Sequence, residues 1–137
     1  MTSGYRERLQ RGLSLTTSSD LLINARRVLE TCSKQSPARV RNDLDQCPAT
    51  ISTVLRRLQL LLPLLNECPR SVLLLGDDDL LGLALAATEL PERITVLDLD
   101  DAVLEKTAQW SPPGCIETVR YDLRMPLPET LLSQFSI

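Results

Sequence analysis

Two stretches in the first half of the chain place apolar residues at helical spacing. Residues 21–32 form the first predicted helix, with Ser19 or Asp20 as its cap. Residues 51–65 form the second, with Thr50 or Ser52 as its cap, and Pro63 is expected to bend it or end it early. A short helix over residues 38–44 fits between them. The predicted buried faces consist of Leu22, Ala25, Val28 and Leu29 in the first helix and of Val54, Leu55, Leu58, Leu61, Leu62 and Leu65 in the second.

From residue 72 the pattern changes to strands that alternate with helices. Strands are predicted over residues 72–75, 94–100 and 116–122, and helices over residues 80–90 and 101–110. Such alternation predicts an α/β fold with a parallel sheet. A loop at 124–129, a short helix at most over 130–134 and the start of a fourth strand at 135–137 follow. Three strands make half of a doubly wound sheet, so we expect the chain to be a fragment or a truncated form of something longer.

The composition limits which catalytic groups the chain can use and which cellular compartment is expected. The 137 residues suffice for one ordinary domain or two very small ones, and the chain has no histidine, which removes the commonest general base and metal ligand. No metal site is predicted, because the cysteines form no CxxC pair. A polar amino terminus and an interrupted leucine-rich stretch (58–75) argue against a signal peptide and a membrane span. We therefore expect a cytoplasmic protein with reduced thiols at Cys32, Cys47, Cys68 and Cys115.

The charge is divided unevenly along the chain. Residues 1–70 carry 11 basic and 6 acidic side chains, a balance of +5, whereas residues 71–137 carry 4 basic and 12 acidic ones, a balance of −8. The second half therefore suits a cationic partner by long-range attraction. The alternative is two solvated surfaces of unlike sign.

Carboxylates follow all three predicted strands. Gly76 turns the chain after the first strand, Asp98 or Asp100 ends the second, and Asp122 ends the third. The carboxyl ends of parallel strands share one edge, where such folds bind ligands. Three further acids directly follow Gly76, in the place of a phosphate-binding glycine loop; these are Asp77, Asp78 and Asp79.

These acids suggest distinct roles. Adjacent like charges raise each other's pKa, so one carboxyl of the triplet could act as a base near neutral pH and remove a proton from an attacking ammonium. Asp98 could hold the hydroxyls of a ribose, and Asp122 an exocyclic amine such as that of adenine. The alternative for each residue is ordinary turn and cap chemistry.

Four motifs in order resemble the branched-chain polyamine synthases, the N(4)-bis(aminopropyl)spermidine synthase family, over about residues 43–137. Asp45-Gln46-x-Pro48-x-Thr50-x-x-Thr53-x-x-Arg56-Arg57 is similar to its linker, and Leu75-Gly76-Asp77-Asp78-Asp79-Leu80 to its acidic motif. Val96-Leu97-Asp98-Leu99-Asp100 is similar to its second strand, and Tyr121-Asp122-Leu123-Arg124-x-Pro126-Leu127-Pro128 to the segment before its fourth strand.

The resemblance implies a fold and a reaction. The expected fold is α/β, with an N-terminal helical, winged-helix-like remnant (1–42), a linker and helix (43–70) and the first half of a Rossmann-like aminopropyltransferase domain (71–137). The implied reaction moves an aminopropyl group from decarboxylated S-adenosylmethionine to a secondary amine of spermidine. No permanently bound cofactor is implied, and a homodimer is compatible with the resemblance.

The resemblance also implies roles for individual residues. Asp78 would be the base, assisted by Asp77 and Asp79, and the donor would be bound by Gly76, Asp98, Asp100 and Asp122. Thr50, Arg56 and Arg57 would line the domain junction. The chain departs from the family pattern in two places: it ends before the family's fourth strand and Asp-Pro-Pro motif, and residues 1–42 match nothing. A half-sheet without those groups is not expected to turn over by itself.

Three other classes of protein share parts of the pattern. A phosphorylated receiver domain would use Asp78 and Asp122, but does not need the second acidic strand end. A methyltransferase keeps more glycines in its first loop than Gly76 alone. A DNA-binding module in residues 20–65 would rest on Arg56 and Arg57, which is weak support without aromatic residues or a basic arm, so nucleic acid is not the expected partner.

Overall fold

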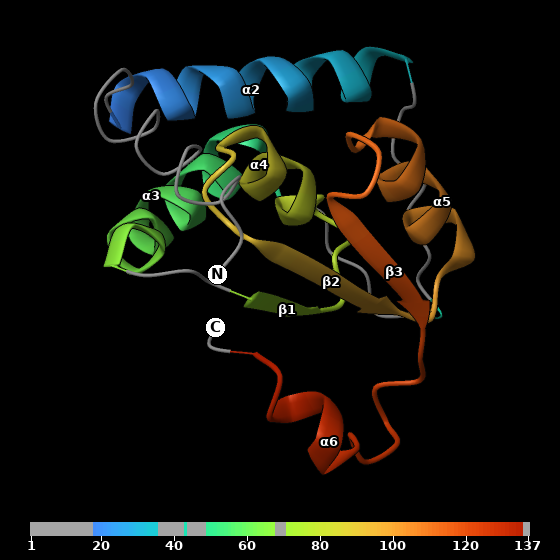
Figure 1. Ribbon diagram of the computed structural model, residues 1–137. Coiled ribbons are helices and arrows are strands. Elements are labelled where there is room, and N and C mark those ends of the chain that lie inside the picture. Colours follow the sequence, from blue (N-terminus) through green and yellow to red (C-terminus); the bar gives the residue numbers. More distant parts are fainter. Residues whose placement is uncertain (1–17, 36–42, 44–48, 68–70, 136–137) are drawn as a thin grey trace.

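The computed structural model describes residues 18–35, 43, 49–67 and 71–135, which form a parallel sheet with helices on both faces (Figure 1). The strands are β1 (Ser71–Leu75), β2 (Arg93–Asp98) and β3 (Ile116–Arg120), in the order β1-β2-β3. Val72 pairs with Ile94, and Ile94 in turn with Ile116. Both pairings are parallel, so the carboxyl ends of all three strands lie at one edge, which confirms the predicted sheet.

Helices build two layers on one face of this sheet. α4 (Leu81–Ala87) and α5 (Asp101–Trp110) pack on the strands, and α3 (Ile51–Glu67) lies beside α4. α2 (Ser18–Gln35) forms the outer layer across α3 and α4 (Figure 1). The last helix, α6 (Glu129–Leu132), lies on the opposite face of the sheet (Figure 1). None of the described helices is long and apolar enough to cross a membrane.

The main core lies between the helices and the sheet. α4 is buried over most of its length, as its almost wholly apolar sequence predicts. The two long helices contribute residues three or four positions apart, which places them on one face. These residues are Leu21, Ala25, Leu29 and Cys32 of α2, and Val54, Leu58, Leu62 and Leu65 of α3.

The C-terminal segment is attached to the other face by Arg93 at the start of β2. Its guanidinium donates to Glu117 Oε2 at 3.0 Å and to Gln134 Oε1 at 3.3 Å. It also lies 5.3 Å from the centre of the Phe135 ring. These contacts hold the end of the described chain against the sheet.

Several predicted boundaries were wrong. α2 begins at Ser18, so Ser19 and Asp20 lie within it and do not cap it. α4 ends at Ala87, because Glu89 adopts a positive φ of 58° that a helix cannot contain. β2 and β3 end two residues earlier than predicted, since Asp100 and Asp122 belong to the following turns.

Pro63 does not end α3. The helix continues to Glu67, and the exposed side of the helix accommodates the proline. The Thr50 cap is confirmed, because its hydroxyl accepts from the Thr53 amide at 3.2 Å. The short helix predicted over 38–44 lies outside the described residues except for Asp43, and so does the strand start predicted at 135–137, except for Phe135, which is not in a strand.

Candidate functional site

The turn after β1 is built from two residues with left-handed backbone. Gly76 has a φ of 78° and Leu80 a φ of 61°. The Gly76 amide donates to the Leu97 carbonyl at 2.7 Å, and the Leu80 amide donates to the Asp77 carbonyl at 3.0 Å. A left-handed conformation costs a non-glycine residue roughly 1–2 kcal/mol, so the fold maintains strain at Leu80. These two residues turn the chain from β1 into α4, with the three acids between them.

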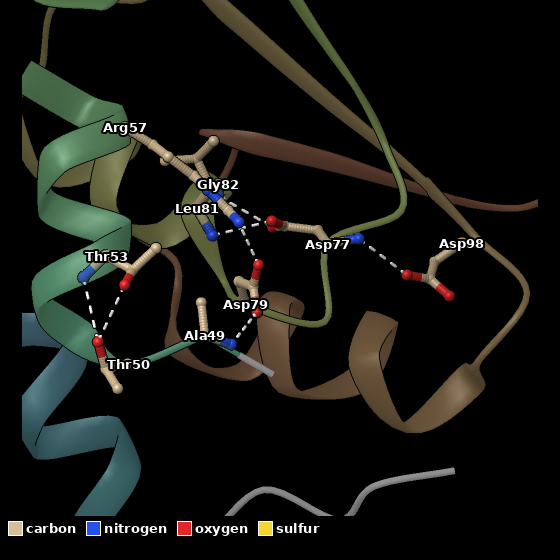
Figure 2. Close-up of polar contacts among 9 residues, drawn as sticks. All are labelled: Ala49, Thr50, Thr53, Arg57, Asp77, Asp79, Leu81, Gly82 and Asp98. Atoms are coloured by element: carbon tan, nitrogen blue, oxygen red, sulfur yellow. Dashed lines mark hydrogen bonds and ion pairs between the residues drawn. The ribbon is translucent and has the colours of Figure 1, made fainter. Parts of the chain in front are cut away.

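Asp77 is a buried cap of α4. Its Oδ1 accepts from the Leu81 amide at 2.8 Å and its Oδ2 from the Gly82 amide at 2.9 Å (Figure 2). Burial raises the pKa of Asp77 to about 8, against the opposing effect of these two hydrogen bonds; the charges of Asp79 and Asp98 add to the rise. The expectation that the triplet contains a carboxyl titrating near neutral pH thus holds for Asp77, but burial is the main cause and like charge a minor one.

Gly82 allows this close approach of α4 to the turn. A Cβ atom there would lie 2.8 Å from Asp77 Oδ2 and 3.3 Å from Val96 Cγ2. Both distances are shorter than ordinary contacts, so only glycine fits without a shift. An isolated glycine inside an apolar helix was the available signal for this packing, and the sequence analysis did not use it.

Asp79 connects the turn to α3. Its Oδ2 accepts from Arg57 Nη1 at 2.5 Å, and its Oδ1 accepts from the Ala49 amide at 2.6 Å (Figure 2). The Asp79 side chain is 12% exposed. Asp78 lies between these two anchored acids and is partly exposed. Asp77 and Asp79 are therefore bound to neighbouring elements, and Asp78 is the residue between them.

Asp98 joins the ends of β1 and β2. Its Oδ2 accepts from the Asp77 amide and its Oδ1 from the Asp100 amide, each at 2.9 Å. Asp100 caps α5, because its Oδ1 accepts from the Ala102 amide at 3.0 Å. Gly76 is also close, since a Cβ at Gly76 would lie 4.0 Å from Asp98 Oδ2. The structure thus brings together the residues predicted on the first two strand ends.

Asp122 is bound by a residue that the sequence analysis gave no role. Its two oxygens accept from the Arg124 side chain at 2.7–3.2 Å, and Oδ1 also accepts from the Arg124 amide at 3.0 Å. Hydrogen bonds from the Arg124 side chain lower the pKa of Asp122 to about 2. The residue before Asp122 ties it to the sheet edge where the other acids lie. The Tyr121 amide donates to the Asp98 carbonyl at 3.0 Å. The Asp-x-Arg spacing could have indicated this pair.

The family model for the branched-chain polyamine synthase A C-terminal domain matches residues 24–137, so the expectation that residues 1–42 match nothing was wrong for residues 24–42. This chain belongs to that family. Relatives named N(4)-bis(aminopropyl)spermidine synthase are 34% identical over 91% of this chain in Thermococcus kodakarensis and 39% identical over 75% of it in Thermus thermophilus. The aligned residues cover 35% and 30% of those relatives, so the chain spans about a third of their length.

A solved structure shares both fold and sequence with the chain. It is the branched-chain polyamine synthase from Thermus thermophilus in complex with N4-aminopropylspermidine and 5'-methylthioadenosine. The match has a TM-score of 0.65 and 38% identity, and covers 77% of this chain and 31% of that one. It confirms the α/β fold. The receiver, methyltransferase and DNA-binding alternatives find no support among these relatives.

Proposed function

We propose that this chain provides the acidic strand-end edge of an aminopropyltransferase of polyamine biosynthesis. The observation that carries the proposal is the connected set of carboxylates at the ends of β1 and β2, on a fold whose relative binds a branched polyamine and 5'-methylthioadenosine. An edge of this charge attracts a polyamine. The proposed donor is decarboxylated S-adenosylmethionine and the proposed acceptor is spermidine. The free thiols of Cys32 and Cys115 are consistent with a cytoplasmic location.

The proposed reaction begins with loss of a proton from the secondary ammonium of spermidine. The freed lone pair on nitrogen attacks the carbon of the aminopropyl group next to the sulfonium. A C–N bond forms as the C–S bond breaks, and the sulfur keeps the electron pair of that bond. The products are N4-aminopropylspermidine and neutral 5'-methylthioadenosine, and the base holds the proton.

Asp78 is the proposed base. Asp77 is only 3% exposed and bound to the start of α4, and Asp79 is bound to Arg57 and to the Ala49 amide. Asp78 is partly exposed and sits between them, where a polyamine nitrogen can approach it. Asp77 and Asp79 assist by fixing the turn.

The donor is proposed to lie across Gly76 and Asp98. Each oxygen of Asp98 accepts one backbone hydrogen bond, which leaves lone pairs for ribose hydroxyls. Asp100 supports the position of Asp98 by turning the chain into α5. Asp122 is the proposed acceptor for the amino group of adenine. Its carboxylate oxygens already accept from Arg124, so adenine would share them with that side chain.

Calorimetry on the whole chain tests this proposal. We expect saturable binding of 5'-methylthioadenosine and of spermidine, and we expect Asp78→Asn to lower spermidine affinity at least tenfold while 5'-methylthioadenosine still binds. Asp101→Asn is the matched control, because it removes the same charge from an exposed residue at the start of α5. Equal loss in both variants would mean that bulk charge, and not Asp78, binds the amine. Folded protein that ignores both ligands would contradict the proposal.

A further inference from the structure

One ion pair connects α3 to the acidic turn, although its members are 22 residues apart in sequence. Arg57 Nη1 donates to Asp79 Oδ2, and the Ala49 amide just before α3 donates to the other Asp79 oxygen (Figure 2). Charge-assisted hydrogen bonds of this kind are about twice as strong as neutral ones. The beginning of α3 therefore holds Asp79 at two points.

The α3 side of this contact has a fixed position. The Thr50 hydroxyl caps the helix, and the Val54 amide donates to the Thr50 carbonyl at 3.1 Å. Val54 and Leu58, on either side of Arg57 in sequence, are buried in the core with exposed fractions of 2% and 0%. Arg57 thus extends from a backbone that cannot move independently of the core.

On the turn side, α4 holds both ends of the backbone: the Asp77 carboxylate caps the helix, and the Leu80 carbonyl accepts from the Leu83 and Ala84 amides at 3.2 and 3.4 Å. Asp77 is fixed to α4 and to Asp98, whereas Leu80 occupies a left-handed conformation that the local sequence does not favour. Asp78 lies between Asp77 and Asp79. Without Arg57, Asp79 Oδ2 would lose its charge-assisted hydrogen bond, and the segment from Asp78 to the strained Leu80 would be free to relax.

The guanidinium also offsets charge where it is most crowded. Neighbouring carboxylates repel one another when they are ionised, and Arg57 places a positive charge directly on Asp79.

We propose that Arg57, acting through Asp79, is a positioning residue that sets the place of the Asp78 carboxylate for the polyamine amine. The identity of the ligand rests on the proposed function. The positioning role rests on the contacts between Arg57 and Asp79 in the turn. In this proposal Arg57 acts through Asp79 and not by contact with either substrate. Through Arg57, α3 contributes to the proposed site although it is not one of the elements that follow the strand ends.

The experiment compares Arg57→Gln with Arg56→Gln in the full chain. Arg56 is the matched control, because it is the adjacent arginine on α3 and lines a groove of about 470 Å³ between α2 and α3 instead of contacting the turn. Amide hydrogen exchange of residues 78–80 and spermidine affinity by calorimetry are measured in each variant. Arg57→Lys is the conservative variant, since it keeps the charge but not the fork of donors.

We expect Arg57→Gln to speed exchange at residues 78–80 at least tenfold, leave exchange in β2 unchanged and lower spermidine affinity at least tenfold. Arg56→Gln should change neither, and Arg57→Lys should restore part of both. Faster exchange with unchanged affinity would overturn the positioning role and leave a structural one. Wild-type exchange in Arg57→Gln would overturn the proposal outright. If the unaltered chain does not bind spermidine, the proposed function fails, and the exchange data still decide whether Arg57 holds the turn.

Discussion

Asp77 shows at the scale of one residue how an acid at a binding edge can serve the fold. Its carboxylate stands where a nucleotide-binding fold would place a phosphate, yet both oxygens cap the first amides of α4. Burial makes its negative form costly, so its pKa rises to about 8. An acidic motif in sequence therefore contains carboxylates in unlike environments.

The raised pKa of Asp77 predicts a pH dependence of stability. Between the ordinary value of 3.8 and about 8, the folded chain holds a proton that the unfolded chain has released. The free energy of unfolding should therefore fall as pH rises through this range, and the stabilisation is fully present below it. Urea unfolding at about pH 5 and about pH 8 measures the slope.

Asp77→Asn isolates this effect, because its side chain carries no charge at either pH. We expect the variant to lose most of the slope, while Asp101→Asn, at an exposed position, keeps it. An unchanged slope in Asp77→Asn would show that Asp77 does not titrate in this range.

Elements were predictable where the signal was local. The apolar run of β1 before Gly76 and the three- and four-residue spacing of α3 depend only on neighbouring residues, and both elements formed, with α3 running two residues past its predicted end. The contact of Arg57 with Asp79 was not predictable, because it depends on how α3 packs beside the sheet. The resemblance placed Arg57 at a domain junction without identifying its partner.

The packing of α4 against the turn gives a prediction at the element scale. Replacing a glycine within a helix by alanine normally raises the free energy of unfolding by up to about 1 kcal/mol. Gly82→Ala should instead lower the free energy of unfolding by about 1–3 kcal/mol, because its Cβ would overlap Asp77 Oδ2 and crowd Val96. Chemical denaturation measures the change.

A double-mutant cycle identifies the cause of that loss. In an Asp77→Ala background the carboxylate is absent, so Gly82→Ala should cost much less than it does in the unaltered chain. An equal cost in both backgrounds would place the clash at Val96 and Leu74 instead.

The net charge differs between the two halves of the chain, at +5 over residues 1–70 and −8 over residues 71–137. If this field attracts the polyamine, spermidine affinity should fall steeply between low salt and about 1 M, where the screening length is about 3 Å. Binding of neutral 5'-methylthioadenosine should change little over the same range. Calorimetry at several salt concentrations measures both, and equal salt dependence for the two ligands would argue against an electrostatic polyamine site.

The structure of the chain bound to N4-aminopropylspermidine and 5'-methylthioadenosine tests the central claim most directly. The measured quantity is the distance from the Asp78 carboxylate to the branching nitrogen of the polyamine. The account predicts about 2.6–3.2 Å, or one bridging water, with the ribose hydroxyls at Asp98. A polyamine bound away from the turn after β1, or ribose held by other residues, would contradict it.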